Sequence, residues 1–228
     1  MKWHFEDFIY GSFDGSVTTF AIVAGAVGAS LSPLIVLILG FANLAADGFS
    51  MAAGNYQATK ARIEYIQKER GREEWEVENM ADLERQEIRD IYAKKGFANE
   101  LLDEIVRVIT ARKKVWIDTM MKEELGLIDD GRRPLHTAIS TGVGFVIIGM
   151  IPLAPFIFLH ATGLQISVLQ SFLYSVGFTC GAFFLIGMIK GRIVKTSMTR
   201  SGLITLLIGS IAATVAYLVG HALSTIIG

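Results

Sequence analysis

The chain consists of long apolar stretches interrupted by one long charged stretch. Five apolar windows each have about 20 residues, the length that a helix needs to cross the roughly 30 Å hydrocarbon layer of a bilayer. These windows cover residues 13–29, 34–56, 135–159, 166–189 and 203–227. Ser32-Pro33 separates the first two windows, and this pair favours a tight turn followed by a new helix start. The pattern predicts five transmembrane helices, the first two forming an antiparallel hairpin.

Residues 60–134 form a charged insert between the second and third predicted spans. The insert holds 18 of the 22 acidic residues and 16 of the 21 basic residues. Its sequence predicts helices over residues 73–95 and 98–125, with Gly71 and Gly96 as breaks, and it contains no strand pattern. No helix stop precedes Arg70, so we expect the second membrane helix to continue into the insert.

The predicted fold is an all-α membrane protein of three segments. Residues 1–59 hold transmembrane helices one and two, residues 60–134 form a cytoplasmic helical domain, and residues 135–228 hold helices three to five. Pro152 and Pro155 predict a kink in helix three. A content of 52% hydrophobic residues among 228 is too high for an ordinary soluble domain, so the chain is expected to be an integral, multi-pass membrane protein.

The orientation follows from the positions of Lys and Arg. Outside the insert, basic residues occur at Lys2 and between helices four and five, at Lys190, Arg192, Lys195 and Arg200. Cytoplasmic loops carry an excess of positive charge. We therefore expect the N-terminus, the insert and the 190–200 loop in the cytoplasm and the C-terminus on the other side. The first residues lack the pattern of a signal peptide, so no cleavage is expected.

Polar residues inside the first two predicted spans indicate a metal site. Asp14 and Asp47 are the only carboxylates within the five windows, and an ionisable group in a span usually faces a cavity or an ion pathway. On the second span, four-residue steps place Asn43, Met51 and Asn55 on one stripe with Asp47. Oxygen ligands with a thioether suit a divalent transition metal better than Mg²⁺ or Ca²⁺. The alternative is that Met51 packs, the amides connect helices, and Asp14 caps a helix start.

The insert offers a second candidate metal site. Two E-x-x-E pairs lie eleven residues apart, which places all four glutamates on one face of a continuous helix: Glu73, Glu76, Glu84 and Glu87. A bound cation would relieve their repulsion. Further along, thioethers and a carboxylate occupy adjacent turns at Met120, Met121 and Glu124. The alternative is a solvated acidic helix that pairs with the basic segment 112–114.

Three classes of function fit these features. The first is a metal transporter, which the membrane carboxylates favour. The second is a di-iron oxidase in the insert, but helical di-iron sites use Glu-x-x-His motifs and the insert has no His between Lys60 and Arg133. The third is a membrane-anchored metal sensor, which would not need Asp47. We therefore expect no enzyme activity, no prosthetic group and no nucleic-acid partner.

Four motifs together resemble the vacuolar iron transporter family: "FDGSVTTFAIVAGA", "ANLAADGFSMAAGNYQATKAR", the doubled E-x-x-E and "MMKEELGL". The resemblance covers nearly the whole chain. It implies a homodimer of five-helix subunits that moves Fe²⁺, and sometimes Mn²⁺ or other divalent ions such as Co²⁺ and Zn²⁺, out of the cytosol in exchange for protons. It also implies intramembrane metal positions at Asp14 and Met51, and cytoplasmic ones at the glutamates and methionines of the insert.

The chain departs from this family at one place. Eukaryotic members carry Glu where this chain has Asn43, and a small residue where it has Asp47. One helical turn separates the two positions, so Asp47 is a candidate for the displaced carboxylate. The short N-terminus resembles prokaryotic members, for which the expected location is the plasma membrane; in a eukaryote it would be the vacuolar membrane.

Overall fold

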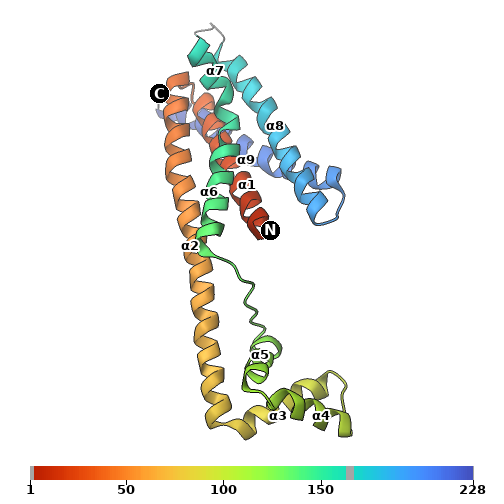
Figure 1. Cartoon of the computed structure of the whole chain (residues 1–228). Helices are drawn as coiled ribbons and strands as arrows, with labels where there is room; N and C mark the ends of the chain where they lie inside the picture. Colours follow the sequence, from red (N-terminus) through yellow and green to blue (C-terminus); the bar gives the residue numbers. More distant parts are fainter. Residues whose placement is uncertain (1–2, 163–166, 228) are drawn as a thin grey trace. The chain divides into compact units, whose positions relative to one another are not determined.

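The computed structural model of the chain describes residues 3–162 and 167–227, and the regular elements in these ranges are all helical (Figure 1). The all-α prediction is therefore confirmed for this part of the chain. The elements are α1 (Trp3–Gly28), α2 (Pro33–Asn79), α3 (Ala81–Lys94), α4 (Asn99–Thr110), α5 (Lys113–Glu123), α6 (Pro134–Gly149), the 3-10 turn η1 (Ile151–Leu153), α7 (Ala154–Thr162), α8 (Val168–Ile193) and α9 (Met198–Ile227).

Four segments of the described residues are long and apolar enough to cross a membrane: Pro33–Asn79, Pro134–Thr162, Val168–Ile193 and Met198–Ile226. They overlap the second to fifth predicted windows, and the apolar part of α2 is residues 34–56. α1 is not among the four, since Ser12, Asp14, Ser16 and Thr19 make it less apolar. A fifth span at α1 stays a prediction.

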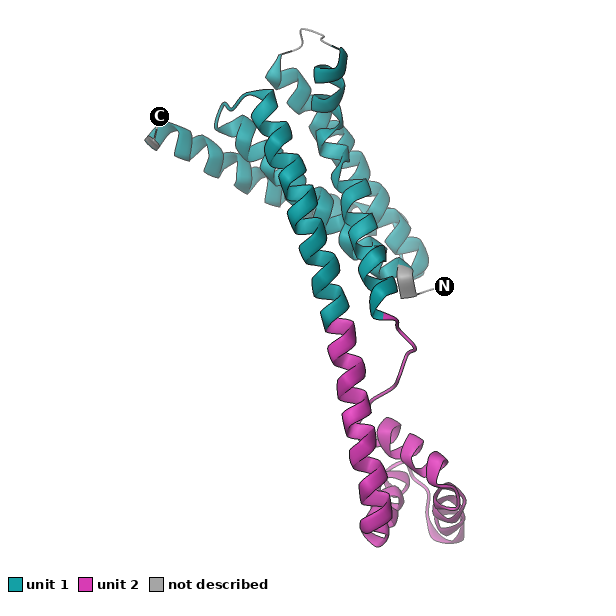
Figure 2. Ribbon diagram, turned by 60° about the vertical axis from the view of Figure 1, so that its left-hand side comes forward, with its two compact units in different colours: residues 1–57, 134–228 teal, residues 58–133 magenta. Residues whose placement is uncertain are grey.

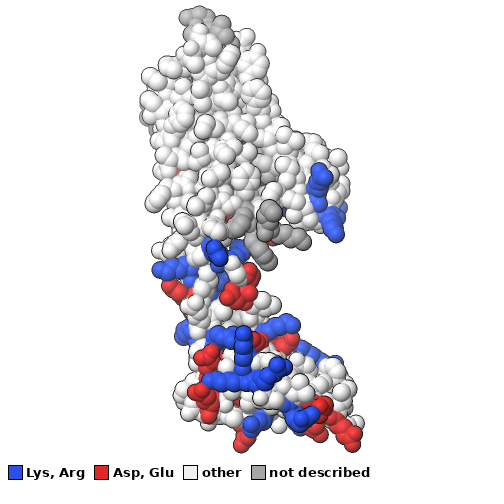
Figure 3. Space-filling view, in the orientation of Figure 1, with Lys and Arg blue, Asp and Glu red and all other residues white. Residues whose placement is uncertain are grey.

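The chain divides into two compact units (Figure 2). Unit 1 consists of residues 1–57 and 134–228, and unit 2 of residues 58–133. Charged side chains cover the surface of unit 2, whereas the surface of unit 1 is nearly free of them in the same view (Figure 3). The two units therefore differ in the charge of their surfaces as well as in the residues that form them.

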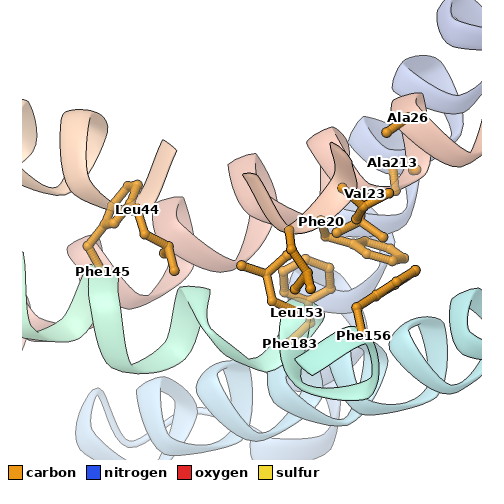
Figure 4. Close-up of a cluster of buried hydrophobic side chains, with 12 residues drawn as sticks. Phe20, Val23, Ala26, Leu44, Phe145, Leu153, Phe156, Phe183 and Ala213 are labelled. Atoms are coloured by element: carbon orange, nitrogen blue, oxygen red, sulfur yellow. The ribbon is translucent and has the colours of Figure 1, made fainter. Parts of the chain in front are cut away.

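In unit 1, α1 packs against α6, α8 and α9. Its buried side chains Phe20, Val23 and Ala26 meet apolar residues of the surrounding helices in one core (Figure 4). α1 and α6 approach very closely, because a Cβ at Gly11 would lie 1.9 Å from the carbonyl oxygen of Thr141. Small residues permit such close helix contacts in membranes. The small glycine, serine and threonine residues that make α1 less apolar therefore also allow it to pack closely against the other helices.

The predicted kink of helix three is confirmed as a break between α6 and α7. Pro152 lies in η1 and has no backbone N–H, so the helix ladder is interrupted at this position. Ser175 Oγ on α8 donates a 2.6 Å hydrogen bond to the carbonyl oxygen of Pro152. Both residues are buried, so this bond gives the Pro152 carbonyl oxygen a side-chain partner on a neighbouring helix.

Unit 2 differs from the prediction at three helix boundaries. α2 continues through Gly71 and ends at Asn79, so the expected continuation of this helix is confirmed and the break at Gly71 is wrong. The helix expected over residues 73–95 is interrupted at Met80, which has φ −129° and ψ 32°. The helix expected over residues 98–125 is interrupted between Thr110 and Lys113. Neither interruption falls on glycine or proline.

The hydrophobic core of unit 2 explains these two interruptions. Apolar side chains from α2, α3, α4 and α5 pack together in it: Ile66, Val77, Ile88, Leu102, Val106, Ile109, Trp116, Ile117, Met120 and Met121. Straight helices would not bring these residues together. Bends at the two interruptions allow them to be buried, and burial of apolar area is the main favourable contribution to folding. The chain therefore bends where the core requires it.

Candidate metal-binding sites

In unit 1, one side of α1 faces α2 where the predicted membrane site lies. Asn43 Nδ2 donates weak hydrogen bonds to Thr19 Oγ1 at 3.3 Å and to Thr18 Oγ1 at 3.4 Å. Thr18 Oγ1 in turn donates to the backbone oxygen of Asp14 at 2.9 Å. Asp14 is half-buried and lies near enough to Asp47 for their charges to interact. The structure thus brings Asp14, Asn43 and Asp47 into one region.

The other two residues of the α2 stripe contact neighbouring parts of unit 1. Met51 is half-buried and packs against the core of unit 1. Asn55 Nδ2 donates to Asp7 Oδ1 at 2.9 Å and to Thr141 Oγ1 at 2.6 Å, so it connects α2 to α1 and α6. Asn55 therefore performs the helix-connecting function that was the alternative for the amides.

Asp7 is a carboxylate that the sequence analysis missed. It is only 5% exposed and lies on α1 seven residues before Asp14, about two helical turns away. The first apolar window begins at residue 13, whereas α1 begins at Trp3. The seven-residue spacing of Asp7 and Asp14 would have placed them on one side of α1 if that helix had been extended toward its N-terminus.

In unit 2, two glutamates at the centre of the predicted acidic site are buried. Glu73 is 0% exposed and Glu84 is 3% exposed. Burial, with the charges of Glu124 and Glu76, raises the pKa of Glu73 to about 7. Burial, with the charges of Glu87 and Glu73, raises the pKa of Glu84 to about 7. A carboxyl pKa rises when its charged form loses water or meets like charge, so both groups titrate near neutral pH.

The grouping of the glutamates was predicted correctly, but the reason was wrong. Glu73 and Glu76 lie on α2, whereas Glu84 and Glu87 lie on α3, beyond the interruption at Met80. They are therefore not one face of a single helix. Their charges interact with one another and with Glu124 after α5, so the bend at Met80 still leaves them near one another. The tertiary fold thus produces the cluster that we had inferred from helical spacing.

Arg72 is the cation that accompanies these carboxylates. It lies 3.1 Å from Glu69, 3.3 Å from Glu73 and 3.9 Å from Glu76. The basic segment 112–114 was the expected alternative partner of the acidic helix, and Lys113 of this segment does pair with Glu78 on that helix. The spacings of three and four residues between Arg72 and the carboxylates Glu69 and Glu76 are the pattern that would have identified this contact.

The acidic site has unsatisfied capacity for a ligand. Glu73 Oε2 and Glu84 Oε2 are buried and have no hydrogen-bond partner among the described residues. Met120 and Met121, 0% and 4% exposed, lie in the core of unit 2. In the part of the chain that the structure describes, no group of three or more His, Cys, Asp or Glu side chains is arranged to hold a metal ion. Binding here would require these side chains to change rotamer.

Comparison with known proteins decides the family. The family model described as "VIT family" matches residues 5–221. The chain belongs to this family. It is 38% identical over 224 residues to the "Vacuolar iron transporter" of Toxoplasma gondii, covering 96% of this chain and 74% of that protein. It is 35% identical to the protein of the same name from Plasmodium berghei, covering 98% and 84%, and 34% identical to "Vacuolar iron transporter 1" of Oryza sativa subsp. japonica, covering 96% and 85%.

Family membership confirms two predictions. The relatives carry names of transporters, which indicates a transporter and not an enzyme. The apolar helices, with this membership, establish an integral membrane protein. The di-iron oxidase alternative is therefore set aside.

Proposed function

We propose that this protein exports Fe²⁺, and also Mn²⁺, from the cytosol in exchange for protons. The observation that carries the proposal is the proximity of Asp14 on α1 to Asp47 on α2, in the unit that holds the apolar helices. An isolated carboxylate in a membrane costs roughly 3 kcal/mol on insertion scales, and two that repel each other cost more. A dication between them offsets this cost. In a prokaryotic cell the route leads across the plasma membrane, and in a eukaryotic cell into the vacuole.

Coupling to protons follows from the chemistry of these carboxylates. A carboxylate binds a metal only in its deprotonated form, so metal and protons compete for the same oxygens. When the metal leaves, the same oxygens are free to take up protons. In our proposal Asp14 and Asp47 carry metal in one direction and protons in the other. Asn43 supplies a neutral oxygen and Met51 a soft thioether ligand that favours transition metals over Mg²⁺.

Unit 2 is proposed to collect metal ions on the cytoplasmic side. Its carboxylates with pKa values of about 7, Glu73 and Glu84, are only partly ionised when empty at neutral pH. A dication stabilises the ionised form and so displaces the protons. Glu76, Glu87 and Glu124 provide further oxygens, and Met120 and Met121 bias the site toward Fe²⁺, Co²⁺ or Zn²⁺. Such a site, which is not preformed, should bind weakly and release readily.

The exposed face of α2 supports the proposal of a homodimer. Asp47 is exposed in the single chain, and Phe49 nearby on the same helix is 76% exposed. A carboxylate facing lipid is unfavourable, whereas one facing a partner subunit or a water-filled cavity is not. We therefore expect a second copy to cover this face, with the N-terminus and unit 2 of both copies in the cytoplasm.

The test is Fe²⁺ flux into proteoliposomes with and without an imposed pH gradient. Asp14→Asn and Asp47→Asn should each reduce flux to background while the protein still assembles. Asn43→Glu should retain more flux than Asn43→Leu, because it preserves an oxygen ligand. Flux near the wild-type rate in an aspartate variant would show that this residue is not part of the ion pathway. Flux that does not respond to the pH gradient would show that the protein is a uniporter without proton coupling. Metal binding without any flux indicates a membrane-anchored sensor instead.

A further inference from the structure

We propose that the turn between α8 and α9 binds the phosphate group of an anionic phospholipid. The site lies in unit 1 and shares no residue with the proposed metal sites. The inference does not depend on which ion the protein transports.

A pocket of about 380 Å³ opens at this turn. Two cations line it, Lys190 from α8 and Arg200 from α9, together with three hydroxyl side chains, Thr196, Ser197 and Ser201. A guanidinium presents paired N–H donors to phosphate oxygens, an ammonium acts as a compact positive charge, and hydroxyls donate further hydrogen bonds. The beginning of α9 adds the partial positive charge of a helix N-terminus. The donors in this pocket therefore suit a phosphate group.

No carboxylate neutralises these cations. The sequence contains no Asp or Glu after Asp130, so neither α8 nor α9 contributes an acid. Lys190 and Arg200 form no ion pair within residues 3–162 and 167–227. Figure 3 shows a group of blue side chains over the α8–α9 turn without red side chains beside them. An unpaired group of cations attracts an anion.

The turn that holds the pocket is tightly packed. The N–H of Thr196 donates to the carbonyl oxygen of Gly191 at 2.8 Å, and Lys195 closes the turn with φ +55°. A Cβ at Gly191 would lie 3.0 Å from Met198 Cα, so the end of α8 lies directly against the start of α9. The two cations are thus held on a fixed scaffold, which reduces the entropy that binding must remove.

The position of the pocket selects a lipid over a soluble phosphate. The apolar stretch of α8 ends at Ile189, immediately before Lys190, and that of α9 begins at Leu203, three residues after Arg200. Both apolar residues are exposed, at 46% and 59%. Val194 and Ile204 add apolar surface to the pocket itself. Basic pockets between transmembrane helices at the cytoplasmic surface suit phospholipid head groups, and the apolar rim suits the glycerol and acyl carbons.

Lipid binding to the full-length, delipidated protein in detergent tests the proposal by native mass spectrometry. Phosphatidylglycerol is titrated as the anionic probe and phosphatidylcholine as the zwitterionic one. Lys190→Gln/Arg200→Gln removes both cations of the pocket. The matched control, Arg192→Gln/Lys195→Gln, removes the same charge from the same turn but from residues that do not line the pocket. We expect phosphatidylglycerol to bind about tenfold more weakly to the pocket variant, with a change of less than about threefold in the control.

Three results overturn the proposal. If phosphatidylglycerol binding is weakened equally in both double variants, the lipid is attracted by the general charge of the turn and not by the pocket. Equal affinity for phosphatidylcholine shows that the anionic group is not recognised. Complete displacement of the lipid by millimolar inorganic phosphate assigns the pocket to a soluble anion. The single variants Lys190→Gln and Arg200→Gln, both at exposed side chains, give the same comparison with a smaller change if the double variant does not fold.

Discussion

Replacing Glu73 with glutamine should stabilise unit 2 and weaken its metal binding at the same time. The Glu73 side chain is fully buried, and one of its carboxylate oxygens has no hydrogen-bond partner among the described residues. A neutral amide of the same shape does not carry the cost of a buried charge next to other carboxylates. It also binds a dication less well. A metal ligand that is buried at an energetic cost should give a variant that is more stable but binds metal more weakly. An ordinary structural glutamate should not give this combination.

The size of the stabilisation follows from the pKa of Glu73. Burial and neighbouring charge raise this pKa from 4.5 to about 7. The folded state therefore binds the proton more tightly than the unfolded state, and the resulting stability is complete below pH 4.5 and lost as the pH rises through 7. The loss is at most about 3 kcal/mol at pH 8. Allowing for relaxation, we expect Glu73→Gln to raise the Tm of metal-free unit 2 by about 5 to 10 °C at pH 8 and not at pH 4.

Metal affinity should change in the opposite direction. A dication needs the deprotonated carboxylate, so each ligand with a pKa near 7 weakens binding about tenfold between pH 8 and pH 6. Glu73 and Glu84 together give the wild-type unit a loss of up to about a hundredfold over this range. Glu73→Gln should bind Co²⁺ or Zn²⁺ more weakly at pH 8 and show about half of this pH dependence on a logarithmic scale.

Residues 58–133 have their own hydrophobic core, so the isolated unit is suitable for these measurements. Circular dichroism follows thermal unfolding, and calorimetry with Co²⁺ or Zn²⁺ follows binding. The control is Glu74→Gln, a change at the adjacent exposed residue of the same helix. A Glu73→Gln unit that is no more stable than wild type at pH 8, or that binds metal as tightly, refutes the reasoning.

Three further predictions concern unit 1. Ser175→Ala removes the hydrogen bond to the Pro152 carbonyl and should destabilise the detergent-solubilised protein by about 1 kcal/mol, measured as a lower Tm; an unchanged Tm shows that water or another group satisfies this carbonyl. Gly11→Ala forces α1 away from α6 and should sharply reduce the yield of folded protein, whereas Gly177→Ala, where a Cβ meets nothing within 4 Å, should be tolerated; equal yields contradict the close packing. Asn55→Leu removes the hydrogen bonds that connect α2 to α1 and α6 and should lower both the Tm and Fe²⁺ flux, whereas wild-type values in both assays would show that these bonds are dispensable.

Local physical chemistry explains why much of the fold was predictable. A run of apolar residues long enough to cross a bilayer has to satisfy its backbone groups internally, so it forms a helix whatever surrounds it. Pro152 interrupts a helix because proline has no backbone N–H to donate. Pro33 suits the start of a helix because the N–H groups of the first turn have no partner within the helix. The two membrane aspartates were identifiable because a carboxylate in an apolar window is costly. Each of these inferences depends on residues near one another in the sequence.

The interruption at Met80 and the burial of Asp7 were not predictable in this way. Met80 is not a helix breaker, and the chain bends there because Val77 and Ile88 pack in the same core. Asp7 belongs to a polar start of the sequence and becomes buried because α2 and α6 provide Asn55 and Thr141 around it. The pKa values of Glu73 and Glu84 depend on carboxylates from other helices. Their charge states therefore exist only in the folded unit.

The sequence by itself determined which segments are helical and apolar and which residue types are available as ligands, because hydrogen bonding within a helix and transfer of apolar side chains from water are local properties. Only the tertiary structure decided which carboxylates meet and which are buried. Distances between helices depend on packing, and electrostatic interactions depend on distance and on exclusion of water. Glu73 and Glu84 illustrate the difference, since eleven residues of sequence separate them and a change of helix brings their charges together.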